Sequence, residues 1–93
     1  MLEAAELPVG VVAVRTTPEL TAETVPAGLV RAHRVAKGVW GRLCVRDGVV
    51  LFVSEDTGES RSLAAGDTQV IEPEVPHHVE PAAGARFVVE FYR

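Results

Sequence analysis

The sequence is poor in the features that mark several large classes of protein. It holds one cysteine, Cys44, so no disulfide can form within the chain. Nine Lys and Arg stand against thirteen Asp and Glu with no basic cluster, which weighs against binding to nucleic acid or to an anionic membrane. No apolar run approaches the roughly 20 residues of a transmembrane helix, and the acidic start MLEAAELPVG is unlike a signal peptide. We therefore expect a cytoplasmic protein with no nucleic-acid or membrane partner.

Aromatic residues are also few, at five, while 47% of the 93 residues are hydrophobic and only 24% are charged. That balance is typical of a folded chain, and the length suits one small domain over residues 1–93. The apolar residues are mostly Val and Ala, and eight Gly and six Pro punctuate them. β-Branched residues between turn formers favour strands, so the predicted class is all-β.

Short apolar or alternating runs recur between turn residues, as in a β-sandwich or barrel of about eight to ten strands. The dipeptide Asp47-Gly48 is a strong hairpin signal and predicts that runs 39–46 and 49–54 are antiparallel neighbours. Thr17 ahead of Pro18 predicts at most one helical turn over 18–24. The expected strands are Val9–Arg15, Leu29–Val35, Val39–Arg46, Val49–Ser54, Arg61–Leu63, Thr68–Ile71, His77–Glu80 and Arg86–Tyr92.

Alternation within two of these runs assigns their faces, because successive strand residues point to opposite sides. In the run 39–46, one face carries Val39, Gly41, Leu43 and Val45, and the other carries Trp40, Arg42, Cys44 and Arg46. In the last run, one face carries Phe87, Val89 and Phe91, and the other carries Val88, Glu90 and Tyr92.

The stretch from Gly66 to Pro81 resembles the second conserved motif of the cupin superfamily. In that motif a Gly-Asp turn leads through a strand and a proline-rich corner to a metal-binding histidine, and here the corner is IEPEVPHH. Rigid prolines deliver the next side chain into the mouth of the barrel, so the resemblance assigns His77 as a ligand. Glu74 stands where the motif usually has Gly, and His78 has the opposite strand parity. The resemblance implies a cupin-type jelly-roll β-barrel or sandwich.

The first cupin motif is incomplete. It normally offers two histidines two residues apart and then a glutamate. Here only His33 is an imidazole, Arg31 takes the place two residues earlier, and Gly41 stands where the glutamate is expected.

A narrower resemblance covers about residues 12–93. The elements TTP, VPAGLVRAH, GVWGRLCVRDG, VIEPEVPHHVEP and FVVEFYR together are similar to the small cupin domain of tellurite-resistance TehB-like proteins. That resemblance implies a fold and leaves the biochemical function open.

His33, His77 and Glu90 are the candidate metal ligands, since two imidazoles and a carboxylate with open positions suit a divalent ion such as zinc, iron, manganese or nickel. Glu90 would reach the space vacated at Gly41. The alternatives are an empty polar pocket with histidines as wall residues, and a surface pair of Glu90 with Arg42 or Arg86. No nucleotide cofactor is expected.

Two more residues are candidates for lining the pocket. Arg31 is placed either to hold an anionic group, such as an oxyanion, or simply in solvent. Trp40 suits a ligand mouth or, with Tyr92, the interface of a homodimer, and the alternative for both residues is simply to cover the edge of a sheet.

Three functions remain open from the sequence: a small-molecule or oxyanion binding module of a stress or tellurite-resistance type, a metal-dependent dioxygenase or isomerase, and an interaction protein with a vestigial pocket.

Overall fold

The computed structural model describes residues 2–30 and 35–93 and confirms the all-β prediction. Two short 3-10 turns accompany the strands, and no helix of the described residues is long and apolar enough to cross a membrane. The elements in chain order are η1 (Leu2–Ala4), β1 (Ala13–Thr16), β2 (Leu20–Thr21), η2 (Ala27–Val30), β3 (Trp40–Asp47), β4 (Val49–Ser54), β5 (Ser60–Ala64), β6 (Thr68–Ile71), β7 (His77–Pro81) and β8 (Arg86–Tyr92).

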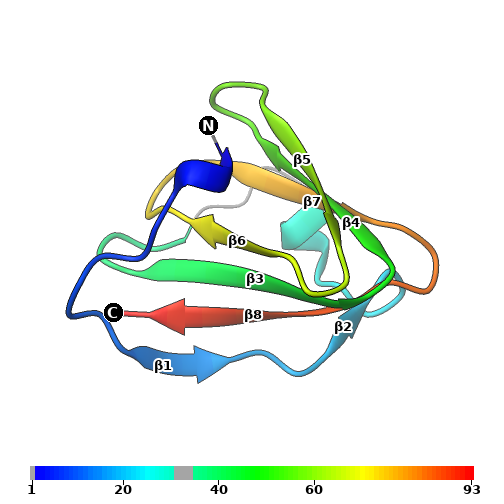
Figure 1. Ribbon diagram of the computed structural model, residues 1–93, viewed down its shortest axis with the longest axis horizontal. Coiled ribbons are helices and arrows are strands. Elements are labelled where there is room, and N and C mark those ends of the chain that lie inside the picture. The colour runs from blue at the N-terminus through cyan, green and yellow to red at the C-terminus, as the bar shows by residue number, and fades with distance from the viewer. Residues whose placement is uncertain (1, 31–34) are drawn as a thin grey trace.

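The strands form two antiparallel sheets (Figure 1). The larger sheet has five strands in the order β1-β8-β3-β6, with β2 also paired to β8. The smaller sheet has three strands in the order β5-β4-β7. Both sheets are open, so the described strands do not close into a barrel.

The hairpin predicted at Asp47-Gly48 is wrong. β3 pairs with β6 and β8, whereas β4 pairs with β5 and β7, so the chain passes from one sheet to the other at this dipeptide. Gly48 has φ +71°, and its amide donates to the Asp47 carboxylate at 2.9 Å. A type I′ turn needs a positive φ at both central residues, and Asp47 does not have one. The dipeptide forms a corner, and the glycine makes the corner tight.

Two further local predictions fail near the N-terminal third. Thr17 does not cap a helical turn, because its amide and hydroxyl both bond to the backbone of Val89 on β8, at 2.9 and 3.0 Å. The segment 18–24 therefore holds the short strand β2 followed by a turn closed by Thr21 and Thr24. The strand predicted over Leu29–Val35 begins instead with η2, and its residues 31–34 lie outside the described part of the chain.

The core lies between the two sheets, and the strand alternation predicted its members correctly. Leu43 and Val45 on β3 and Phe87 and Val89 on β8 are all at most 3% exposed. They pack with side chains from β4, β5, β6 and β7, namely Val50, Phe52, Leu63, Ile71 and Val79. The opposite faces of β3 and β8 carry half-buried residues such as Arg42 and Glu90, together with Val88, which is 3% exposed.

Candidate functional site

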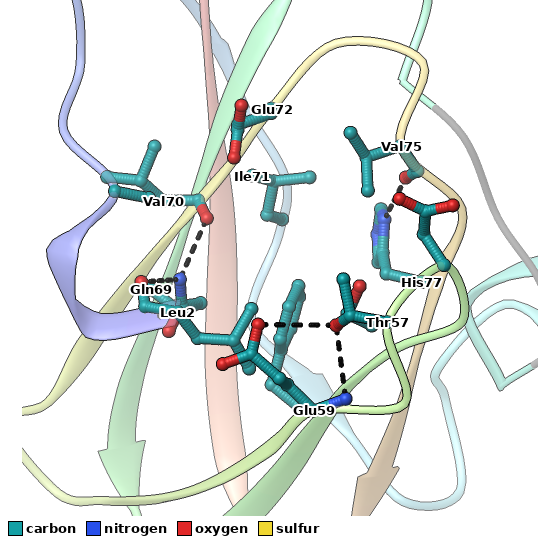
Figure 2. Close-up of a pocket in the computed structure, with 13 residues that line it drawn as sticks. Leu2, Thr57, Glu59, Gln69, Val70, Ile71, Glu72, Val75 and His77 are labelled. Atoms are coloured by element: carbon teal, nitrogen blue, oxygen red, sulfur yellow. Dashed lines mark hydrogen bonds between the residues drawn. The ribbon is translucent and has the colours of Figure 1, made fainter.

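A cavity of about 240 Å³ lies beside His77 (Figure 2). It is bordered by β4, the loop 55–59, β6, the start of β7 and the N-terminal segment. Its volume is just below the roughly 300 Å³ at which pockets for drug-sized molecules begin, so it suits an ion or a small polar molecule. The polar lining residues are Ser54, Asp56, Thr57, Glu59, Gln69, Glu72 and His77, and the apolar ones are Leu2, Ala5, Phe52, Val70, Ile71 and Val75.

The proline corner places His77 at this cavity. Pro73 and Pro76 bracket a turn in which Glu74 has φ +62°, a left-handed conformation that favours glycine. The Glu74 amide donates to the carbonyl of the buried Val35 at 2.9 Å, and this hydrogen bond ties the corner to the segment that begins at residue 35. A glycine would adopt this φ without the steric cost that the Cβ of Glu74 imposes.

His77 is a buried wall residue with a defined ring orientation. It is 2% exposed, and its ring stacks on Phe52 with centroids 5.2 Å apart and planes inclined by 20°. Nδ1 lies 3.2 Å from the Val75 carbonyl oxygen. A carbonyl can only accept, so Nδ1 is the donor, and in the neutral ring Nε2 then carries the lone pair. Metal-ligating histidines usually have this arrangement, in which the other ring nitrogen donates to a carbonyl or carboxylate.

Gln69 holds the N-terminal segment against the cavity. Its side chain is 1% exposed, and Nε2 donates to the carbonyl oxygens of Leu2 at 2.7 Å and Val70 at 3.0 Å. Arg61 donates to the Gln69 Oε1 at 3.1 Å, so both ends of the amide are bonded. A buried amide with all these partners is costly to replace, and it fixes η1 beside β6.

The loop 55–59 supplies the acidic rim. Asp56, Thr57 and Glu59 line the cavity, and the Thr57 hydroxyl donates to the Glu59 carboxylate at 3.3 Å and accepts from the Glu59 amide at 3.2 Å. Glu72 adds a third carboxylate from the end of β6. None of the described lining residues is Lys or Arg, so the local charge favours a cation over an anion.

The structure does not bring Glu90 to His77. Glu90 lies on the outer face of the larger sheet, opposite the core, and accepts hydrogen bonds from Arg42 Nε and the Tyr92 hydroxyl, both at 2.8 Å. This is the surface pair with Arg42 that the sequence left open as an alternative. The space in front of Gly41 is already filled, because a Cβ at that position would lie 3.2 Å from the Ile71 Cβ.

The same contacts set the protonation of this outer-face group. Burial pushes the pKa of Glu90 upward, but hydrogen bonds from Tyr92 and Arg42 outweigh burial and hold that pKa below its usual value. Burial and the nearby Glu90 carboxylate raise the pKa of the Cys44 thiol. The thiol therefore stays protonated at neutral pH, in keeping with a packing role.

The other predicted site residues fall in different places. His33 and Arg31 lie outside the described residues. Trp40 is on the outer face of β3, directly opposite Tyr92 on β8, and does not line the cavity at His77. Among residues 2–30 and 35–93, no three His, Cys, Asp or Glu side chains are grouped so as to hold a metal ion.

Sequence reasoning missed Gln69 and the loop 55–59 as parts of this site. Gln69 is an amide that shares the inward face of β6 with Ile71, and that parity was the one signal that pointed to a buried polar role. The loop has no motif, and only the pairing of β4 with β5 and β7 brings it beside His77.

His78 provides a pH-dependent contact just outside the cavity. Its ring contacts the Glu55 carboxylate through Nδ1 and the Glu80 carboxylate through Nε2, the latter at 2.8 Å. The hydrogen bond to Glu80 is the main cause that raises the pKa of His78, and Glu55 adds to it against the opposing effect of burial. Glu55 begins the loop 55–59, and its amide also donates to the Pro76 carbonyl at 2.9 Å.

We expect the stability to fall as pH rises through the raised pKa of His78. The folded state holds the proton more tightly than the unfolded state, so this contribution is complete below about pH 6.5 and is lost above it. The loss is small, below about 1 kcal/mol per pair, because the carboxylates are partly in solvent. Denaturant unfolding from pH 5 to 9 should show the decline in the wild type and not in His78→Gln. An identical decline in both proteins would contradict the assignment.

The chain is thus a small all-β domain of two open antiparallel sheets with a polar, acid-rimmed cavity beside a buried histidine. A family model described as the TehB-like domain matches residues 15–89. The chain belongs to the TehB-like domain family.

Solved structures share the fold. The crystal structure of a protein from E. coli strain K12, a target of the Northeast Structural Genomics Consortium, is 26% identical with a TM-score of 0.87, and the match covers 96% of each chain. TehB from Haemophilus influenzae is 21% identical with a TM-score of 0.76. That match covers 88% of this chain and 31% of TehB, so the chain spans about a third of TehB. A comparison with curated protein sequences finds no match.

Proposed function

We propose that this chain is a small cytoplasmic binding module with a cupin-type jelly-roll fold, acting in a stress response of the tellurite-resistance kind. The observation that carries the proposal is the cavity of about 240 Å³ beside the buried His77. The bound species is a small cation or polar molecule, and a divalent ion (zinc, iron, manganese or nickel) is the first candidate. His77 is its principal described ligand.

The donor chemistry supports an ion better than an oxyanion. Nδ1 of His77 donates to the Val75 carbonyl, and metal-ligating histidines usually have this arrangement, in which the other ring nitrogen is the ligand atom. The carboxylates of Asp56, Glu59 and Glu72 surround the same space with no described cation among the lining residues. The described residues do not complete a metal site, so a bound ion would need a further donor, for which His33 is the candidate.

Thermal unfolding with and without metal tests the proposal. Untagged protein titrated with zinc, manganese, nickel or ferrous iron should gain stability with one of them, because an ion that binds only the folded state adds its binding free energy. At an ion concentration 100 times the Kd, the gain of about 2.7 kcal/mol raises the Tm by roughly 10 to 20 °C. His77→Ala should abolish this gain.

His78→Ala is the matched control. His78 is the next residue along β7, but it points away from the cavity and does not line it. The His78 variant should keep the full metal-dependent rise in Tm. A His77→Ala variant that loses equal stability with and without chelator would assign His77 to packing against Phe52 alone and would end the metal proposal.

We propose a second copy of this chain as its protein partner. Trp40 and Tyr92 are half-buried cross-strand neighbours on the outer face of the larger sheet, and large amphipathic side chains of this kind are enriched at interfaces. Light scattering should give twice the 9.9 kDa chain mass. Trp40→Ala should shift that mass toward the monomer. A wild-type monomer at micromolar concentration would refute the dimer.

A further inference from the structure

A second, larger cavity lies apart from His77. It is an open cavity with a volume of about 770 Å³, and it is bordered by β1, the chain around β2, η2, the segment 35–39 and the end of β8. Figure 1 shows β1 beside β8, and residues of both strands line the cavity. It shares no described lining residue with the cavity at His77. The volume falls within the roughly 300 to 1,000 Å³ typical of small-molecule sites.

The walls are apolar and incompletely covered. Leu20 and Val35 form a buried floor at 8% and 5% exposure. Leu29, Val39 and Phe91 pack against the core but remain half-buried, so part of each apolar side chain faces the cavity. An apolar ligand would cover these surfaces and gain the usual free energy of removing apolar area from water.

The polar groups at the rim are cationic. Arg15 on β1 is aligned with Phe91 on β8, and its guanidinium carbon lies 4.7 Å from the centroid of the Phe91 ring. Arg93 follows two residues after Phe91, and its backbone is bonded to Val12 in both directions, at 3.0 and 3.1 Å. Both arginines line the cavity, and the Arg15 guanidinium covers the aromatic ring at the edge of this apolar space.

These two cations have no carboxylate partner within ion-pair distance in the described part of the chain. The acidic residues nearest in sequence are paired elsewhere. Glu19 contacts Arg86 at 3.7 Å, and Glu90 bonds to Arg42 on the opposite face of the sheet. In a chain with a net charge of −4, two arginines without acidic partners at one rim make a local positive site.

We propose that this cavity binds a monocarboxylate with an unbranched apolar chain, with the carboxylate held by Arg15 and Arg93 and the chain lying against Leu29, Val39 and Phe91. Guanidinium groups match carboxylates in geometry and charge, and the aromatic ring below Arg15 restricts its position before the ligand arrives. The proposal is independent of the function proposed for the His77 cavity.

Isothermal titration calorimetry with three eight-carbon probes tests the chemistry. Octanoate should bind, while octanol and octylamine, which lack the anionic group, should bind at least about 10-fold more weakly. Between hexanoate, octanoate and decanoate, each added methylene should tighten binding by up to about four-fold. Equal binding of octanol would overturn the assignment of the carboxylate to the arginines, and no binding of any carboxylate would overturn the site.

Variants separate this site from the other cavity and from misfolding. Arg15→Gln and Arg93→Gln should each weaken octanoate about 10-fold without a large change in Tm, because both side chains are exposed. Arg46→Gln removes an exposed arginine from β3 that does not line the cavity, and it should bind like the wild type. His77→Ala should also retain octanoate binding if it folds. Unchanged affinity in both Arg15→Gln and Arg93→Gln would overturn the proposal.

Discussion

Replacing Gly48 with alanine is expected to destabilise the fold by about 2 to 5 kcal/mol. The left-handed conformation at φ +71° costs any residue with a Cβ about 1 to 2 kcal/mol. The added Cβ would also lie 2.8 Å from the Cα of Ala85 and 3.1 Å from its amide nitrogen, which are backbone atoms that cannot rotate away. Overpacking of this kind adds about 1 to 3 kcal/mol. Denaturant unfolding measures the total loss of stability from the conformational cost and the overpacking together.

Gly58→Ala is the control that measures only the cost of placing a residue with a Cβ in the left-handed conformation. Gly58 has a similar φ of +75°, but nothing lies within 4 Å of the position that a Cβ would take. This variant should lose only about 1 to 2 kcal/mol. If both variants lose the same amount, the close approach of the two sheet-crossing loops at Gly48 contributes nothing, and the corner has room to relax.

The second large effect is expected at Phe87. Its ring is fully buried, and β8 holds it between the two sheets opposite Leu20 and Val45. Phe87→Ala should cost about 3 to 5 kcal/mol through lost burial and the cavity left behind. The free energy of unfolding of a domain of 93 residues is roughly 5 to 14 kcal/mol in total. This single substitution therefore removes a large share of the stability.

Phe91 is the comparison on the same face of the same strand. It is half-buried at the edge of the large cavity, and Arg15 covers one side of its ring. Phe91→Ala should cost about 1 to 2 kcal/mol, because less apolar area is lost. A loss as large as that of Phe87→Ala would show that the cavity wall is as tightly packed as the core.

The sequence predicted strand positions well where alternation was regular and failed where the outcome depended on distant partners. The inward residues of β3 and β8 follow directly from parity, because a strand offers only two faces. The Asp47-Gly48 dipeptide carries a turn signal, but a turn signal does not say whether the next strand stays in the same sheet. That choice depends on Ala85 packing against Gly48 and on β7 pairing with β4.

The candidate site was predictable to a similar degree. The proline corner indicated that His77 points inward and that His78 points away, and both side chains are placed so. Glu90 was assigned by supposing that the space before Gly41 is open, whereas Ile71 fills it. Whether that space is open depends on the side chains of the neighbouring strand, and the local sequence around Gly41 does not show them. The closure of the cavity by Leu2 through Gln69 joins residues 67 positions apart and has no local signal.

The position of β8 has a consequence for how the protein is made. This strand, the last in the described chain, pairs with β1, β2 and β3. Among the described strands β3 also pairs with β6, whereas β1 and β2 pair with β8 alone and cannot join the sheet until residues 86–92 are available. Pairings this distant in sequence also form slowly, in milliseconds to seconds. Between emergence and closure, the unpaired edges of these strands are open to association with other chains.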